Sequence, residues 1–164
     1  MYLLSFCHLK IGKYVSPEKN KIMPEVPVNY LAVLASGVAS MILGYLWYGP
    51  LFGKMWIALS GMSPDKIEAA KAKGMTTSYA LMFVGSLVMA YILSHALVFA
   101  ASFLGTEGVN AGLMTGFWNW LGFIAPVTLG SVLWEGKSWK LWLLNNAYYL
   151  VLLLIMGVIL AVWR

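Results

Sequence analysis

The amino-acid sequence predicts an all-α protein: a four-helix transmembrane bundle with an interfacial segment and a short solvated helix between the first two spans. Hydrophobic residues make up 61% of the 164 residues and charged residues only 10%, whereas soluble proteins contain about 45–50% apolar and about 25% charged residues. A chain of this size has too little interior to hide so much apolar surface from water. Four stretches are also long and apolar enough to cross a bilayer, which takes about 20 helical residues. A soluble enzyme and a disordered chain are therefore excluded.

The four predicted spans follow one another along the chain, separated by one long and two short loops. They cover residues 28–47, 79–103, 111–133 and 141–162. None of them contains Asp, Glu, Lys or Arg, and His95 in the second span is their only histidine. A helix of a small soluble protein would carry a polar outer face, which these stretches lack.

The long loop between the first two spans contains two predicted segments. Gly49 and Pro50 are expected to end the first helix, and the apolar segment 51–59 is expected to lie in the membrane interface. A Ser-Pro-Asp sequence at 63–65 then predicts the start of a short solvated helix, which Gly74 closes.

Basic residues and tryptophans indicate how the spans are oriented. The first and third loops share one membrane face and carry six lysines, while the other face carries five basic residues, four of them within residues 1–22. That distribution leaves the orientation undecided. If the natural start is Met23, the first face carries six lysines and the other face only Arg164. This distribution predicts that loops 1 and 3 are cytoplasmic and that both termini lie outside. Five tryptophans are expected at the lysine-rich face and one at the other: Trp47, Trp56, Trp134, Trp139 and Trp142 against Trp163.

We therefore divide the chain into a basic N-terminal extension, residues 1–22, and a four-span membrane domain, residues 23–164. The extension is expected to result from a miscalled start codon. The intact mass of the natively expressed protein tests this expectation, and a species that contains Met1 would contradict it.

One sequence motif carries a resemblance to a known family. The first span ends in the run Trp47-Tyr48-Gly49-Pro50, which continues through Gly53 and Lys54, and a Gly-Phe-Trp-Asn-Trp run follows at 116–120. This pattern resembles a family of small bacterial four-helix integral membrane proteins, domain of unknown function 1761. The resemblance covers roughly residues 23–164. It implies the same fold and a bacterial inner membrane location, and it supplies no activity, substrate or catalytic residue.

Polar side chains inside the spans are the first candidates for a functional site. His95 and Asn119 lie at similar depths, each about 12 Å from the same end of its span. A hydrogen bond between them would fix the register of two helices. The alternatives are a role of His95 in proton movement or ligand contact, and ligation of a metal or haem.

A second polar group gathers near the lysine-rich face, on three helices. It could line a polar pocket, or its members could bond across helices as structural contacts. Its members are Tyr45, Thr128, Ser131, Asn145, Asn146, Tyr148 and Tyr149.

Small residues and one proline indicate how the helices pack and bend. Ladders of small residues at four-residue spacing occur in every span, among them Gly112 with Gly116 and Gly157 with Ala161, and such ladders let helix backbones approach closely in lipid. Pro126 removes the helical hydrogen bond to Gly122 and, together with Gly130, predicts a kink that is either a hinge or a fixed bend.

The sequence favours a non-catalytic protein that packs against itself or a partner in the membrane. The alternative is a small transporter or channel for an ion or small solute, acting as an oligomer, and a third class is a membrane enzyme or lipid-modifying protein. No catalytic constellation, metal cluster or cofactor motif stands out, and Cys7 is the single cysteine. The expected partners are the lipid bilayer and either a second copy or another membrane subunit, and no nucleic acid.

Overall fold

The described part of the protein consists of helices and their connections, without a strand. In the computed structural model it comprises residues 26–63, 65, 67–69 and 74–163. Four helical segments are long and apolar enough to cross a membrane: Tyr30–Leu51, Thr76–Leu104, Gly108–Leu133 and Trp139–Val162. The predicted all-α class and the four spans are therefore confirmed. The predicted extension, residues 1–22, lies outside the described residues, and of the predicted solvated helix only 65 and 67–69 are described, as helical.

Helix α1 (Tyr30–Leu46) begins at Asn29, whose side chain caps it by accepting hydrogen bonds from two backbone amides. Small residues four apart form its buried face, on which Ala32 and Ser36 are fully buried. The hydroxyl of Ser40 on this face lies 2.7 Å from that of Ser86 on α4 (Thr76–Leu104). The predicted small-residue ladder therefore packs against another helix of the same chain.

The regular α-helix of the first span ends at Leu46, close to the predicted break at Gly49 and Pro50, but helical structure does not stop there. The helix continues through both residues as a π-helical turn, η2 (Trp47–Leu51), and stops at Phe52. The Phe52 amide donates to the Trp47 carbonyl at 2.9 Å, a bond over five residues that encloses Pro50. A proline lacks an amide hydrogen and its ring crowds the preceding turn, and a widened turn accommodates both effects.

Helix α2 (Gly53–Ser60) follows at once and corresponds to the predicted interfacial segment. Its first residue has to be glycine, because a Cβ at Gly53 would lie 2.6 Å from the carbonyl oxygen of Tyr48. The close turn between η2 and α2 therefore depends on a position without a side chain.

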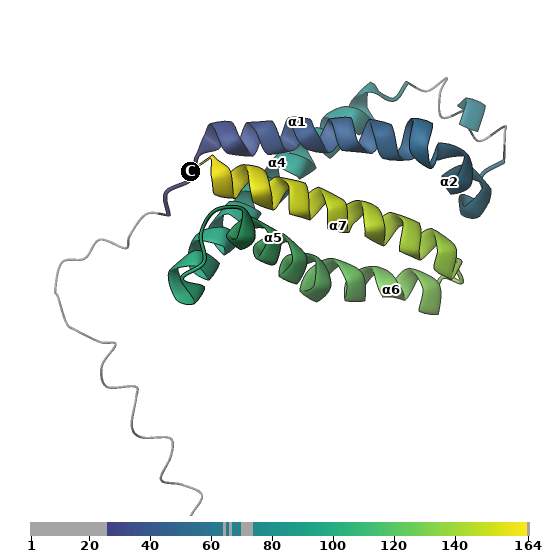
Figure 1. The fold of residues 1–164 in the computed structure, drawn as a ribbon. Helices are drawn as coiled ribbons and strands as arrows, with labels where there is room; N and C mark the ends of the chain where they lie inside the picture. Colours follow the sequence, from purple (N-terminus) through teal and green to yellow (C-terminus); the bar gives the residue numbers. More distant parts are fainter. Residues whose placement is uncertain (1–25, 64, 66, 70–73, 164) are drawn as a thin grey trace, which may run out of the picture.

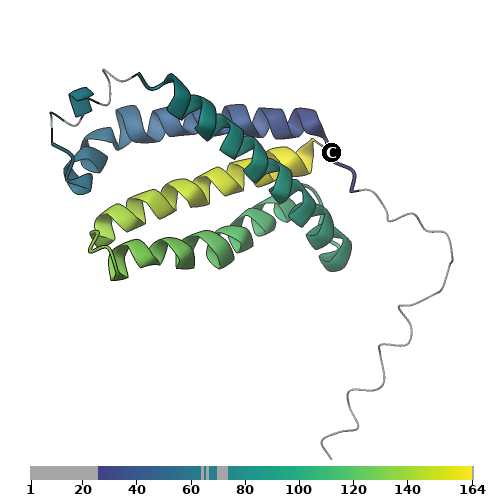
Figure 2. The same ribbon diagram turned by 180° about the vertical axis from the view of Figure 1, so that it is seen from behind.

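Helix α4 (Thr76–Leu104) is the longest element and ends at Gly105, which has a φ of +61°. It crosses α1 and α7 (Trp139–Val162) obliquely, as Figure 2 shows, and contacts α5 (Gly108–Asn119) near its end. The third span consists of α5 (Gly108–Asn119), the π-helical turn η3 (Trp120–Ile124) and α6 (Ala125–Leu133).

The third span bends where the sequence predicts a kink. Turn η3 contains Gly122, and Pro126 occupies the first turn of α6. The amide of Ala125 donates to the carbonyl of Trp120, again over five residues, and the direction of the span changes between α5 and α6 (Figure 1). The bend is present, whereas motion about Gly122, Pro126 and Gly130 stays a prediction.

Helix α7 (Trp139–Val162) lies between α1 and the α5–α6 span (Figure 1) and contributes more buried side chains than any other described helix. Its backbone touches that of α5 so closely that a Cβ at Gly112 would overlap the carbonyl group of Gly157, and the reverse also holds. A Cβ at Gly116 would lie 2.5 Å from the Leu153 carbonyl oxygen. The glycines predicted to pack helices therefore meet within one chain.

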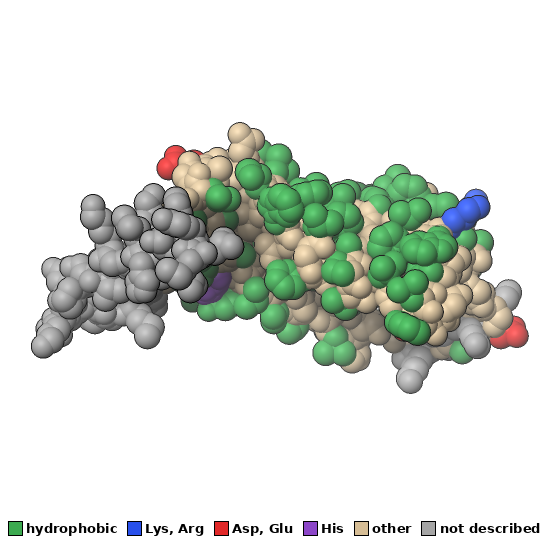
Figure 3. Space-filling model, turned by 90° about the horizontal axis from the view of Figure 1, so that it is seen from below, with side chains coloured by type: hydrophobic (Ala, Val, Ile, Leu, Met, Phe, Trp, Pro, Cys, Tyr) green, Lys and Arg blue, Asp and Glu red, His purple; other side chains and the backbone are tan. Residues whose placement is uncertain are grey.

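The outer surface of the helices is apolar, as expected for a protein surrounded by lipid. Apolar side chains spread over much of the face in Figure 3, and the charged side chains visible there lie toward its ends. Large residues such as Phe103 and Val127 are 87% and 74% exposed. A bilayer would cover this surface, since its core is as apolar as these side chains.

We predict that Gly157→Ala lowers the free energy of unfolding by about 1–3 kcal/mol, because the added methyl group pushes α5 and α7 apart. Thermal unfolding in detergent micelles measures the change. The matched control is Gly85→Ala on α4, where a Cβ meets nothing within 4 Å and where alanine favours the helix by about 1 kcal/mol. Equal behaviour of the two variants would contradict the close contact.

Candidate functional site

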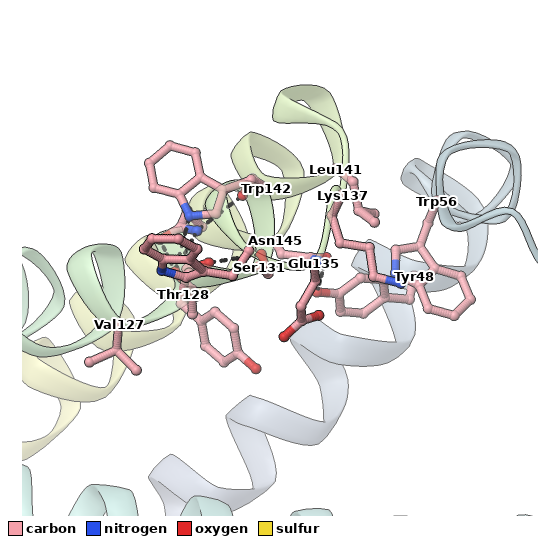
Figure 4. A pocket seen from close by; sticks show the side chains of 14 residues that line it. Tyr48, Trp56, Val127, Thr128, Ser131, Glu135, Lys137, Leu141, Trp142 and Asn145 are labelled. Carbon is pink, nitrogen blue, oxygen red and sulfur yellow. Dashed lines mark hydrogen bonds between the residues drawn. The ribbon is translucent and has the colours of Figure 1, made fainter.

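A cavity of about 670 Å³ lies at one end of the bundle, where η2, α2, α6 and the first half of α7 meet (Figure 4). This end carries the loops that the sequence assigns to the lysine-rich face. Pockets of about 300–1,000 Å³ are typical of small-molecule sites. Four kinds of side chain line this one: aromatic rings, hydroxyl and amide groups, the aliphatic Val127 and Leu141, and two opposite charges, Glu135 and Lys137.

Turn η2 positions the tyrosine that closes one side of the cavity. The hydroxyl of Tyr48 donates to the Asn145 side-chain oxygen on α7 at 3.1 Å. Its ring lies edge-on to Trp56 of α2, with centroids 5.8 Å apart, and 5.0 Å from the ring of Tyr148. The first span, α2 and α7 are thereby joined through one side chain.

A hydrogen-bond network closes the opposite side, between α6 and α7. The Thr128 hydroxyl accepts from the indole of Trp142 at 3.2 Å and from the Asn146 amide at 3.0 Å, and donates to the Ile124 carbonyl at 2.7 Å. The Trp120 indole donates to the Asn146 backbone carbonyl at 3.0 Å. Asn146 is only 2% exposed, and this network supplies the partners that lipid cannot.

The short loop between α6 and α7 brings two charges to the cavity. Gly136 has a φ of +68° and turns the chain, and the Lys137 amide donates to the Ser131 carbonyl at 3.0 Å. Ser138 then caps α7, accepting from the Leu141 amide at 3.1 Å. Figure 4 shows the side chains of Glu135 and Lys137 extending over the cavity from this loop.

Five of the seven polar residues expected near this face do line one cavity: Thr128, Ser131, Asn145, Asn146 and Tyr149. Tyr148 lies beside the cavity, 5% exposed in the core. Tyr45 is 74% exposed, so its placement in the group is wrong. The buried face of α1 continues from Ser40 through Gly44 to Tyr48 at four-residue spacing, which turns Tyr45 about 100° per residue away from it.

Seven lining residues do not belong to any predicted site: Trp56, Val127, Trp134, Glu135, Lys137, Leu141 and Trp142. Tyr48 was assigned only to the family motif. The four-residue spacing of Ser36, Ser40, Gly44 and Tyr48 could have placed it, because these positions share one helix face. No sequence signal places the two loop charges, since their direction depends on how α6 and α7 meet.

The other motif residues form the corner around Tyr48. Trp47 packs on Phe52 with ring centroids 4.7 Å apart, and its buried indole nitrogen has no hydrogen-bond partner among the residues that the structure describes. Gly49 and Pro50 are exposed within η2, and Lys54 is exposed on α2. The motif thus forms the π-helical turn and the start of α2.

His95 and Asn119 are not hydrogen-bonded to each other, so that prediction is wrong. The Nδ1 atom of His95 lies 2.9 Å from the carbonyl oxygen of Tyr91, and the Asn119 amide donates to the Thr115 carbonyl at 2.9 Å. Each side chain thus finds a partner one turn earlier in its own helix. Within the described residues, His95 belongs to no cluster of three or more histidine, cysteine or acidic residues that could hold a metal.

The fold and this cavity define a multi-pass, all-α membrane protein with a polar site at one end of its spans. The family model described as a protein of unknown function (DUF1761) matches residues 31–161, and the chain therefore belongs to this family. Neither a curated protein nor a solved structure matches the chain.

We predict that Thr128→Val lowers the free energy of unfolding by about 1–2 kcal/mol, because the Trp142 indole and the Asn146 amide both lose an acceptor inside the bundle. Thermal unfolding in detergent measures this effect. Thr77→Val, at an exposed position of α4, is the control and should leave stability unchanged. An unaltered Thr128→Val protein would show that the network is dispensable.

Proposed function

We propose that the protein is a non-catalytic membrane protein that binds one amphipathic molecule in the cavity between η2, α6 and α7. The observation that carries this proposal is the order of chemistry along the cavity. Charged groups lie at the loop, amide and hydroxyl groups of α6 and α7 follow, and the positions furthest from the loop are Val127 on α6 and the ring of Tyr149 on α7. An amphipathic molecule has the same order along its length.

The cavity is elongated in the direction of the spans. On α6 its lining residues run from Trp134 to Val127, about 10 Å along the helix. On α7 they run from Leu141 to Tyr149, about 12 Å. Val127 is 74% exposed on the outer surface, so the cavity reaches the surface that faces lipid. A ligand could therefore enter from the bilayer.

The polar middle of the cavity offers unused hydrogen-bond donors. The Asn145 side-chain oxygen accepts from Tyr48, while the two hydrogens of its amide nitrogen have no acceptor among the described residues. Asn145 is half-buried and lines the cavity, so a bound molecule can reach this amide. A carbonyl or phosphate oxygen of a ligand would satisfy it.

The assembly role favoured by the sequence stays a separate proposal. The closest contact of small residues, between Gly112 and Gly157, is used within the chain, so the ladders lend less support to a partner helix.

Transport also stays a proposal. Beyond the cavity, buried side chains such as Leu152, Leu153 and Met156 fill the bundle, so passage of a solute would require a second conformation or an oligomer.

We predict that Ser131→Trp weakens ligand binding about tenfold or more, because the indole fills the cavity and a loss of about 1.4 kcal/mol is a factor of ten. The probes are dioleoyl phosphatidylethanolamine and dioleoyl phosphatidylglycerol, titrated against the full chain in nonionic detergent. Native mass spectrometry counts the lipids retained, and we expect one per chain.

The matched control is Ser78→Trp, which adds the same side chain at an exposed position near the start of α4. It should bind like the unaltered protein. If the unaltered protein retains no lipid, or if both tryptophan variants bind equally, the cavity is not the binding site and the proposed function is wrong.

A further inference from the structure

We infer that the cavity selects a zwitterionic phospholipid, with Lys137 binding the headgroup phosphate and Glu135 the ammonium. This inference rests on the proposed function and specifies its ligand. It is carried by two opposite charges at the mouth, the aromatic rings around them, and the amide and apolar lining beneath.

The two charges belong to one loop, line one cavity and do not pair with each other. Glu135 and Lys137 are separated only by Gly136, and both side chains extend over the cavity in Figure 4. No ion pair joins them in the part of the chain that the structure describes. A ligand with one charge of each sign can therefore engage both, and each charge-assisted hydrogen bond is stronger than a neutral one.

Aromatic rings surround the position of the headgroup. Tyr48 and Trp56 form an edge-on pair on the side of the cavity toward which Lys137 extends in Figure 4. Trp134, which is 87% exposed at the end of α6, also lines the cavity. Indole and phenol rings prefer the headgroup level of a bilayer, so their positions beside the two charges match the depth of a phospholipid headgroup.

The lining below the charges distinguishes a lipid from a free zwitterion. The Asn145 amide lies on α7, further from the loop than Leu141, and can donate a hydrogen bond to an ester carbonyl of the lipid. Leu141 supplies an apolar contact next to the loop, and Val127, at the end of the lining away from the loop, supplies an apolar contact on the outer surface. A soluble headgroup would occupy only the mouth, whereas a phospholipid matches the whole sequence of charged, amide and apolar groups.

The same arrangement disfavours an anionic lipid. Phosphatidylglycerol offers a phosphate to Lys137 but no cation to Glu135, so the Glu135 carboxylate would face additional negative charge without a partner. Phosphatidylethanolamine offers both. The headgroup ammonium therefore determines the preference, and Glu135 is the residue that recognises it.

The test is a competition between dioleoyl phosphatidylethanolamine and dioleoyl phosphatidylglycerol for the full chain in nonionic detergent, followed by native mass spectrometry. We expect the unaltered protein to prefer phosphatidylethanolamine about tenfold, the size of effect that one charge-assisted contact gives. Glu135→Gln should abolish this preference by weakening phosphatidylethanolamine alone, and Lys137→Gln should weaken both lipids.

Matched controls are Glu107→Gln in the loop at the other end of the bundle and Lys140→Gln at the start of α7. Both residues are exposed and neither lines the cavity, so both variants should keep the preference. A hundredfold excess of glycerophosphoethanolamine, which has the same headgroup without acyl chains, tests whether the site binds a soluble zwitterion instead. If it displaces the lipid, the ligand is a free zwitterion rather than a phospholipid.

The failures of the two proposals are distinguishable. Equal retention of the two lipids by the unaltered protein, with loss of both in Ser131→Trp, would overturn the zwitterion preference and leave the cavity as a binding site. An unchanged preference in Glu135→Gln would also overturn it. Retention of no lipid at all would overturn both proposals. Thermal unfolding of each variant verifies that it remains folded.

Discussion

In a bilayer no surrounding water drives helices together, so the backbone contact of α5 with α7 at Gly112 and Gly157 sets the arrangement of the other helices. With α5 held there, α7 lies between α1 and the third span. Turn η3 and Pro126 then redirect α6, none of whose residues is buried. Tight packing at one end of α7 and a bend halfway along its neighbour leave space at the other end, and that space is the cavity.

Two prolines have the same structural effect at two places around this cavity. Pro50 lies within η2 and Pro126 follows η3, and each is accommodated by a π-helical turn. These turns carry Tyr48 and Trp120, whose polar atoms reach Asn145 and the backbone of Asn146 on α7. Widened turns are frequent at functional sites because they redirect side chains that a regular helix would place elsewhere. The prolines therefore shape the site without contributing polar groups to it.

Sequence reasoning predicted features that depend on one helix alone, such as its position and its bend. It failed for the side-chain pairing that depends on how two helices face each other. The four spans and the bend near Pro126 follow from local composition and backbone chemistry. The pairing of His95 with Asn119 was wrong because a carbonyl one turn earlier was available to each. Equal depth in the membrane does not make two side chains neighbours, since the rotation of each helix about its axis also matters.

The sequence by itself determined that the protein lies in a lipid bilayer, that it has four spanning helices, and which polar residues lie near one membrane face. These outcomes follow because charge and hydropathy are properties of single segments. The tertiary structure decided which helices the glycines join, that Tyr48 rather than Tyr45 faces the polar group, and that Glu135 and Lys137 share its mouth. These outcomes depend on how helices rotate and cross, which packing between segments distant in the chain sets.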